Sequence, residues 1–318
     1  MSYVTLSYAL YPFTSFIITY WLTKRISARA EVLGLVDTDL HKPDRRKVAR
    51  VGGIAIMLGY MIPMAFTGLL GVSEKYILAV LFSSSLGGVI GLFDDLFKLN
   101  KVSLILLTLL IGVPIATLRA GIPIVYSSPW GKLNLGVYFW LAVPFIFAFL
   151  TNGVNIYAGF NGLEAGLGAI TAGSLAVCAI LYGSREAALS LLSLTGSLLG
   201  FLIWNKYPAK VFPGNVGTYF VGSVLAASII VGTIKLAGII AIVPYFVNFL
   251  LRLKDGFKWT VGKVDAEGKV YEDRINALWA IFMYKRPRDE WKVVRDCWLL
   301  QLLFGALAVM VAIMAKLR

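Results

Sequence analysis

Long apolar segments recur along the whole 318-residue chain and constrain its fold more than any other feature. Each is about 17–22 residues long, enough for an α-helix to cross the hydrocarbon core of a bilayer. Hydrophobic residues make up 58% of the chain and charged residues 15%, which is unusual for a soluble protein. The sequence therefore predicts an all-α integral membrane protein, a single polytopic domain over 1–318 with about ten transmembrane helices. The predicted spans are 3–23, 50–71, 75–93, 102–118, 135–151, 163–182, 187–203, 214–233, 235–252 and 298–315.

The basic residues are divided unevenly between the two sides of the predicted membrane. Segments on one side carry 23 of the 30 Lys and Arg residues, which leaves seven for the other side and both termini. Because cytoplasmic loops are enriched in Lys and Arg, we expect an integral plasma-membrane protein with the first set in the cytoplasm and both termini outside. The net charge of +13 then reflects topology, and no nucleic-acid partner is expected. The predicted cytoplasmic loops are 24–50, 94–101, 152–162, 204–213 and 252–297.

Few side chains are suited to thiol or imidazole chemistry. Cys178 lies inside a predicted span and Cys297 at the edge of one, so neither a disulfide nor a cysteine metal site is expected. His41 is the sole histidine of the sequence. Carboxylates, amides and cationic side chains therefore have to supply any chemistry.

Asp94 and Asp95 stand side by side at the end of a predicted span, in the stretch GLFDDLFKLNK. The C-terminus of a helix carries partial negative charge, so two carboxylates are disfavoured there. They are also costly at a membrane boundary unless they are paired. A salt bridge with Lys98 or Lys101 is one explanation. The other is a hard divalent cation such as Mg²⁺, which prefers oxygen ligands and substrate phosphates.

A second polar segment, TNGVNIYAGFNGLEAG, follows the fifth predicted span. Its residues Asn152, Asn155, Asn161 and Glu164 would recur on one side of a helical path. The glycines among them would let the backbone approach a ligand closely. A helix end followed by a turn is the simpler explanation, since Asn and Gly are favoured in both places.

A third segment, KYPAKVFPGNVGTYFVG, leads into the eighth predicted span. Asn215 stands at the start of that span, where free backbone N–H groups favour an anion. Phe212 precedes it and offers a flat face to a planar ring. N-capping is the default explanation for an Asn in this position.

The remaining polar stretches read as loops and hairpins. Residues 34–53 mix acids and bases, and a solvated loop near anionic lipid headgroups explains them as well as a functional role does. Residues 257–275 suggest a cytoplasmic β-hairpin, and residues 121–136 suggest one on the other side. We therefore expect small β-hairpins beside the helices, with the reactive segments on the cytoplasmic face.

Three motifs in this order and at these separations resemble a known family: FDDLFKL, NGVNIYAGFNGLEAG and VFPGNVGTYFVG. They resemble the polyprenyl-phosphate N-acetylhexosamine-1-phosphate transferases, which include bacterial MraY and WecA and the eukaryotic dolichyl-phosphate GlcNAc-1-phosphotransferase. The likeness covers essentially the whole chain. The AG after NIY is similar to the eukaryotic and archaeal branch, where bacterial members usually carry DG, and the length of this chain favours an archaeal source.

The resemblance implies roles for the acidic and amide residues. Asp94 and Asp95 match the paired aspartates near the acceptor phosphate and metal, so both are expected to be catalytic and Asp95 also to contact the metal. Asn155 matches a position that helps to hold Mg²⁺. Asn215 stands where most relatives have a metal-binding Asp, which leaves the affinity for metal or the choice of metal open; Mg²⁺ is expected, with Mn²⁺ as an alternative.

Further residues are expected to hold the substrates. Asn161 and Glu164 match the nucleotide-facing part of their loop, and Phe212 matches the aromatic residue that stacks on uracil. Lys101 is similar to a basic catalytic residue that holds phosphate. Basic residues of the long loops are expected to contact substrate as well, and the candidates are Lys42, Lys258, Lys263 and Arg274.

The resemblance implies transfer of GlcNAc-1-phosphate from UDP-GlcNAc to a polyprenyl (dolichyl) phosphate in the bilayer, with release of UMP, as the first step of lipid-linked glycan assembly such as N-glycosylation. The same reaction with another UDP-N-acetylhexosamine stays open, and so does a homodimer. An ion-coupled transporter is the alternative from another class, because intramembrane carboxylates are also typical of transporters.

Overall fold

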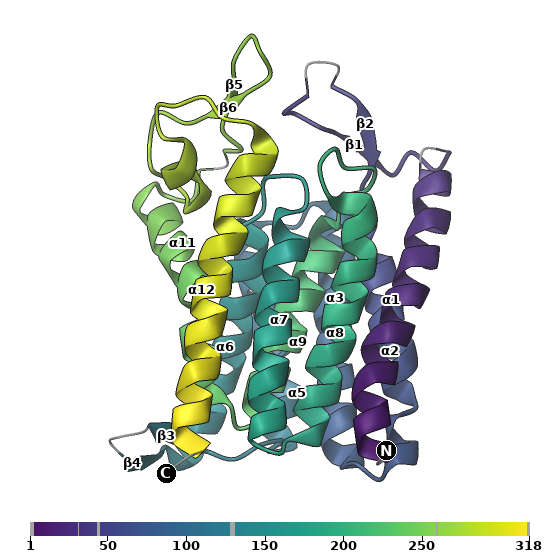
Figure 1. The fold of residues 1–318 in the computed structure, drawn as a ribbon, viewed down its shortest axis with the longest axis vertical. Coiled ribbons are helices and arrows are strands. Elements are labelled where there is room, and N and C mark those ends of the chain that lie inside the picture. The colour runs from purple at the N-terminus through teal and green to yellow at the C-terminus, as the bar shows by residue number, and fades with distance from the viewer. Residues whose placement is uncertain (1–2, 31, 43–44, 128–130, 259, 317–318) are drawn as a thin grey trace.

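The computed structural model describes all residues except 1–2, 31, 43–44, 128–130, 259 and 317–318. Its helices run along one long axis (Figure 1), and short strand pairs lie at both ends. We call the end that carries β1, β2, β5 and β6 the looped end; both chain termini lie at the opposite end. The α-helices are α1 (Tyr3–Ala30), α2 (Gly53–Ala65), α3 (Glu74–Phe97), α4 (Lys101–Leu110), α5 (Val113–Thr117), α6 (Gly136–Ile156), α7 (Leu163–Leu181), α8 (Arg185–Asn205), α9 (Gly214–Val231), α10 (Lys235–Ala241), α11 (Val243–Lys254) and α12 (Glu290–Lys316).

Short 3₁₀ helices and hairpins connect the long helices. The 3₁₀ helices are η1 (Thr67–Leu70) and η2 (Trp279–Met283). Each strand pair is antiparallel, and the pairs are β1 (Val36–Thr38) with β2 (Lys47–Ala49), β3 (Ile124–Ser127) with β4 (Gly131–Asn134), and β5 (Lys263–Val264) with β6 (Val270–Tyr271). Ala49, the last residue of β2, forms a parallel bridge with Val211. The end of β2 therefore lies beside the segment that connects α8 to α9.

Seven helices of the described chain are long and apolar enough to cross a membrane. An eighth span results if α10 and α11, which bend by 52° at a short break, are counted together. The predicted segments 3–23 and 102–118 are also helical, as α1 and as α4 with α5. The molecule is therefore a predominantly helical membrane protein, and the figure of about ten spans stays a prediction.

Several helices are longer than the hydropathy pattern predicts. α1 continues to Ala30, α6 continues to Ile156, and α12 begins at Glu290. The added turns are polar or charged, so they lower hydropathy without ending the helix. Parts of the predicted cytoplasmic loops 24–50, 152–162 and 252–297 are consequently helical, and their cytoplasmic placement stays a prediction.

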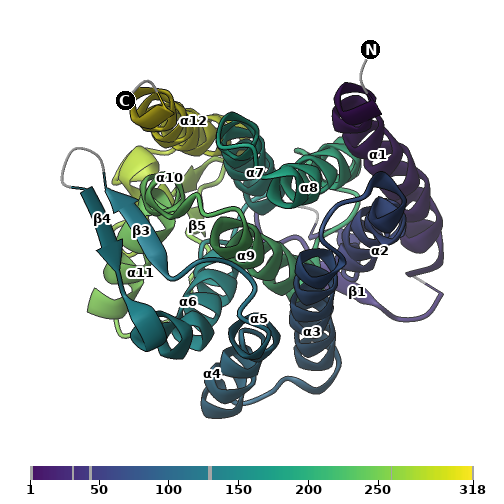
Figure 2. The same cartoon turned by 90° about the horizontal axis from the view of Figure 1, so that it is seen from below.

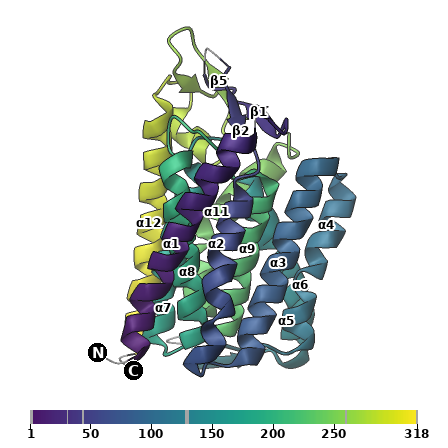
Figure 3. The same cartoon turned by 90° about the vertical axis from the view of Figure 1, so that its right-hand side faces the viewer.

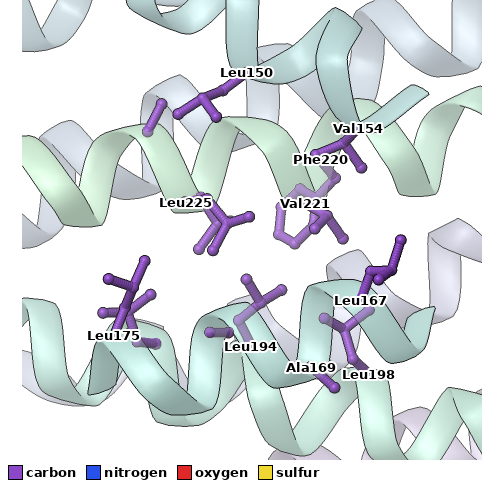
Figure 4. Packing of buried hydrophobic residues seen from close by; sticks show 14 of the residues in the cluster. Leu150, Val154, Leu167, Ala169, Leu175, Leu194, Leu198, Phe220, Val221 and Leu225 are labelled. Carbon is purple, nitrogen blue, oxygen red and sulfur yellow. The ribbon is translucent and has the colours of Figure 1, made fainter. Parts of the chain in front are cut away.

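Helix α9 lies at the centre of the bundle. Viewed along the bundle (Figure 2), the other helices surround it, and 89% of its span is buried. It carries Gly, Ala, Ser and Thr residues that let neighbouring helices approach closely, as expected for packing inside a bilayer. Figure 4 shows Phe220, Val221 and Leu225 of α9 facing residues of α6, α7 and α8. Helix α4, in contrast, lies at the periphery of the bundle, beyond α3 (Figure 3).

Candidate active site

The adjacent aspartates lie in the last turns of α3, where α3 meets the N-terminus of α9. Both oxygens of Asp95 accept backbone N–H groups of α9: Oδ1 from Asn215 and Oδ2 from Val216, each at 3.0 Å. Asp94 Oδ2 accepts from Asn215 Nδ2 at 2.7 Å, and its Oδ1 accepts from the backbone of Leu99 at 3.0 Å. Both side chains are largely buried, with exposed fractions of 9% for Asp94 and 7% for Asp95. The pair is thus fixed by α9 and by its own helix end.

Two glycines allow this close approach. A Cβ on Gly91 of α3 would lie 2.2 Å from the carbonyl oxygen of Asn215, so the two backbones touch at that point. Gly214 has φ +65°, and a Cβ there would lie 2.6 Å from Asp95 Oδ2. Both positions have to be Gly because larger residues would separate α3 from α9 or strain the turn.

Asn155 joins the same cluster from the last turn of α6. Its Oδ1 accepts a hydrogen bond from Thr218 Oγ1 at 2.8 Å, and Thr218 lies three residues after Asn215 on α9. The same Thr218 hydroxyl lies 3.3 Å from the backbone oxygen of Asn215, so Thr218 links Asn155 to the start of α9. The structure therefore brings Asp94, Asp95, Asn155 and Asn215 together from three helices.

The converging groups suit a hard cation that shares its ligands with a substrate. Among the described residues, no group of three or more His, Cys, Asp or Glu side chains could hold a metal. Mg²⁺ is commonly bound by one or two carboxylates, with water and substrate phosphates completing the shell. Because Asn215 donates its Nδ2 to Asp94, its Oδ1 is the amide atom left for a cation. Two carboxylates with amide oxygens therefore fit Mg²⁺ in the presence of phosphate.

Phe212 is placed near the cluster by backbone contacts with the start of α2. Its N–H donates to Ala49 O at 2.7 Å, and its carbonyl accepts from Gly52 N at 3.0 Å. Gly53 N donates to Pro213 O at 2.8 Å. These bonds fix the position of the half-buried aromatic ring three residues before Asn215.

The predicted cationic residues lie farther out. Lys101 begins α4 and is exposed, and in the described chain neither it nor Lys98 forms an ion pair with the aspartates. The salt-bridge explanation for the Asp pair is therefore wrong in this structure. Arg274 is exposed in the loop after β6, and its guanidinium lies 3.7 Å from Asp255. The backbone of Arg50 comes near the pair, since a Cβ on Gly214 would lie 2.7 Å from its carbonyl oxygen as well as 2.6 Å from Asp95 Oδ2. Its guanidinium lies 3.8 Å from Asp37.

Lys42 and Asn161 belong to a buried polar cluster, which we call the Asn161 network: Asp39, Lys42, Asn161 and Glu290. Lys42 bonds to Glu290 and lies 3.6 Å from Asp39. Asn161 donates to Glu290 Oε1 from its backbone at 2.8 Å and from its side chain at 2.6 Å. These contacts occupy both side chains within the protein, and their predicted contact with substrate stays a prediction. Glu164 accepts a backbone hydrogen bond from Gly159 at 3.2 Å and is half-buried.

Some residues of the cluster were not predicted from the sequence. Thr218 and Tyr219 follow Asn215 inside an apolar span, so their polar groups appear as ordinary helix residues. A helical projection would have found Thr218, because it shares a face with Asn215 at i+3. Arg50 is one of eight basic residues in its loop, and the sequence contains no signal that singles it out.

Comparison with known proteins assigns the chain to a family. Residues 77–233 match the model described as Glycosyl transferase family 4. A protein of Saccharolobus solfataricus, provisionally named UDP-N-acetylglucosamine–dolichyl-phosphate N-acetylglucosaminephosphotransferase, is 35% identical over 301 residues, or 93% of this chain and 94% of that protein. This chain belongs to glycosyl transferase family 4.

Other relatives agree with this membership. A Sulfolobus acidocaldarius protein with the same provisional name is 33% identical over 306 residues, or 92% of this chain and 93% of that protein. The phospho-N-acetylmuramoyl-pentapeptide-transferase of Halalkalibacterium halodurans is 27% identical over 283 residues, or 81% and 82% of the two chains. The resemblance to polyprenyl-phosphate N-acetylhexosamine-1-phosphate transferases is thereby confirmed. The part matched to glycosyl transferase family 4 contains both sides of the contact between Asp95 and α9.

Proposed function

We propose that this family 4 protein transfers GlcNAc-1-phosphate from UDP-GlcNAc to a membrane polyprenyl (dolichyl) phosphate and releases UMP. The observation that carries the proposal is the convergence of Asp94, Asp95, Asn155 and Asn215 at one end of the bundle. Two relatives that match nearly the whole chain are provisionally named for this reaction with a dolichyl acceptor. Their archaeal origin also favours an archaeal source for this chain.

The reaction requires positioning more than covalent chemistry by the protein. In phosphoryl transfer the attacking and leaving oxygens lie roughly in line, and catalysis comes from alignment and neutralised charge. The nucleophile is a phosphate oxygen whose second pKa is about 6, so it is largely ionised at neutral pH. A strong general base is therefore not required. One aspartate assists the remaining deprotonation and the other orients the metal or a lysine, without a covalent aspartyl intermediate.

The residues around the pair would hold Mg²⁺, with Mn²⁺ as an alternative. Asp95, Asn155 and Asn215 are the oxygen donors proposed for it, with Asp94 beside them. When bound, the ion neutralises charge on the transferred phosphate. The protein's own part is to hold the donors still: α9 fixes Asp95 through two backbone bonds, and Thr218 fixes the orientation of Asn155.

We further propose that the looped end faces the cytoplasm, with both termini outside. The predicted charge distribution and the gathering of the polar motifs at one end support this orientation. UDP-sugar would then enter from the cytoplasm while the acceptor keeps its tail in lipid. Exposed apolar residues near the pair, Phe93, Leu96 and Phe97, would line the path of that tail.

A substrate panel tests the proposed reaction and its alternatives. Purified protein, Mg²⁺ or Mn²⁺ and polyprenyl phosphate are incubated with several UDP-N-acetylhexosamines, and UMP is quantified. We expect UMP release with UDP-GlcNAc that requires both the cation and the lipid phosphate. Faster release with another UDP-sugar would identify that sugar nucleotide as the preferred donor. Release of no UMP from any donor, together with ion-driven uptake in vesicles, would favour the transporter.

Changing Asn215 to Asp tests the metal assignment. We expect Asn215→Asp to lower the Mg²⁺ concentration for half-maximal activity several-fold, because a carboxylate replaces an amide among the ligands. Without metal, the variant should unfold at a lower temperature than the wild type. The Asn215 amide that donates to Asp94 in the wild type is replaced by a carboxylate that repels it. Thermal unfolding with and without Mg²⁺ measures the second effect. An unchanged Mg²⁺ dependence would exclude Asn215 from the metal site.

Changing Phe212 tests the nucleotide assignment. Phe212→Leu keeps an apolar side chain but removes the flat ring, so we expect the KM for UDP-GlcNAc to rise about 10-fold while kcat changes little; stacking a base on an aromatic side chain is worth about 1–3 kcal/mol. Steady-state kinetics at saturating lipid phosphate measure both constants. A fall in kcat at constant KM would place the ring elsewhere.

A further inference from the structure

Glu290 lies apart from the aspartate pair but contacts two of the segments that lead to it. It is the first residue of α12, and its exposed fraction is 3%. Its Oε1 accepts hydrogen bonds from the backbone N–H and from the side-chain Nδ2 of Asn161. Its Oε2 accepts a hydrogen bond from the ammonium group of Lys42. A carboxylate at a helix N-terminus is favoured by the helix dipole, so the position suits the charge. Nothing in the proposed reaction uses this residue directly.

The Asn161 network joins loops that are distant in sequence. Asp39 and Lys42 come from the loop between β1 and β2, Asn161 from the loop between α6 and α7, and Glu290 from α12. Asn161 Oδ1 accepts from the backbone of Ala209 at 2.6 Å, which adds the segment between α8 and α9. All four named side chains of the network are at least nine-tenths buried, so their charges and amides are compensated inside the protein.

Asn161 and its partner Ala209 lie at equal sequence distances from two residues of the candidate site. It follows Asn155 by six residues, and its partner Ala209 precedes Asn215 by six residues. The chain from Ala209 to Asn215 is held further by the bonds of Phe212 and Pro213 to residues 49–53. One amide thus fixes the two short segments that end at the amides proposed to hold the cation.

The aromatic neighbours make the network rigid. His41 stacks on Phe160 with ring centroids 4.7 Å apart, and its Nε2 donates to Val261 O at 2.6 Å. Phe160 packs edge-on against Trp279 at 5.1 Å, and Trp279 is fully buried. The ammonium group of Lys42 lies over the Tyr207 ring at 4.2 Å. Movement of Asn161 would therefore require movement of several packed rings.

We propose that Glu290 is a positioning residue: by holding Asn161 it fixes the segments 157–161 and 209–215, and through them Asn155 and Asn215. Of the measurements that test this inference, only the kinetic ones rest on the proposed function. Removing the carboxylate frees the backbone N–H of Asn161 and leaves its Nδ2 only the longer bond to Asp39 Oδ2, at 3.3 Å. It also leaves Lys42 without one of its two anionic partners. Small displacements of reactive groups are expensive, since about 1 Å can cost about 100-fold in rate.

The test compares variants of two helix-terminal glutamates. Glu290→Ala is expected to lower kcat about 10-fold and to raise the Mg²⁺ concentration for half-maximal activity several-fold. Hydrogen exchange should become faster in 157–162 and 206–213, which contain the bonded amides of Asn161 and Ala209. The matched control is Glu186→Ala, since Glu186 also lies in the first turn of a long helix and accepts a backbone bond, from Ser73 at 3.0 Å. It should leave kcat, the Mg²⁺ dependence and exchange in these two segments unchanged.

Two further variants keep the test decisive if Glu290→Ala fails to fold. Glu290→Asp retains the negative charge but moves it away from Asn161 by the length of one methylene group. It should therefore speed hydrogen exchange in the same segments. Glu290→Gln retains an acceptor for Asn161, so exchange there should stay close to that of the wild type. Exchange in 157–162 and 206–213 that is equal in the wild type and in Glu290→Asp would overturn the inference. If the wild type releases no UMP, the proposed function fails, and the exchange data still decide the role of Glu290.

Discussion

Replacing Asp95 by Asn should lower kcat about 100-fold or more and also lower the stability of the protein. Both carboxylate oxygens of Asp95 accept backbone N–H groups of α9, which cannot turn away. The Asn side chain would offer its oxygen to one of these N–H groups but would turn its NH₂ group, which cannot accept a hydrogen bond, toward the other. Leaving a buried donor unsatisfied costs about 1–3 kcal/mol. The loss of catalysis follows from the role of a group that acts in the transition state.

Replacing Asp94 by Asn should cost as much activity but less stability. One of its partners is the side-chain amide of Asn215, which can rotate by 180° and present oxygen to the new N–H₂ group. The difference between the two variants is measured by thermal unfolding in detergent, and kcat by UMP release at saturating substrates. Near-native turnover in both variants would contradict the catalytic assignment of the pair. Equal losses of stability would contradict the distinction drawn between them.

Replacing Gly91 by Ala should separate α3 from α9 and remove most of the activity. The new Cβ would lie 2.2 Å from Asn215 O and 2.7 Å from Val216 N, and both are backbone atoms that cannot move away alone. Overpacking of this kind costs about 1–3 kcal/mol. Because the displaced residues are those bonded to Asp95, we expect kcat to fall about 100-fold.

The same substitution at Gly173 is the matched control. Gly173 also lies inside a long helix, α7, and a Cβ there would come no closer than 3.7 Å to Thr195, an ordinary van der Waals distance. Gly173→Ala should therefore preserve both the unfolding temperature and kcat. Equal activity in the two variants would show that the contact between α3 and α9 does not control the geometry of the aspartates.

The sequence predicted the long helices well because a membrane span has a strong signal. Predicted segments 163–182 and 214–233 differ from α7 and α9 by two residues or fewer at each end. The start of α12 was missed because its first turns carry Glu290, Lys292 and Arg295, which resemble a loop in hydropathy. The bend between α10 and α11 was also missed, although Val243–Pro244 marks the point where a proline interrupts the hydrogen-bond ladder.

The candidate site was predicted in part. Asp94, Asp95, Asn155 and Asn215 share segments rich in polar residues, and their types suggested a common cation. Their partners could not be predicted, because the bonds of Asp95 to α9 are made to backbone groups that any sequence possesses. Lys42 and Asn161 were predicted to contact substrate, which stays a prediction, and their contacts with Glu290 join residues 129 or more positions apart. Spacing along the chain does not contain that information.

The contact of α3 with α9 also explains how a carboxylate is accommodated at the end of a helix that should repel it. The two helices are antiparallel neighbours, so the negative pole of α3 lies beside the positive pole of α9. Asp95 occupies the boundary where these opposite fields offset one another. Since α9 is enclosed by protein along its length, dissolved ions screen its field weakly. Moderate changes of ionic strength should therefore alter the electrostatic balance at Asp95 far less than they alter charges on the exposed loops.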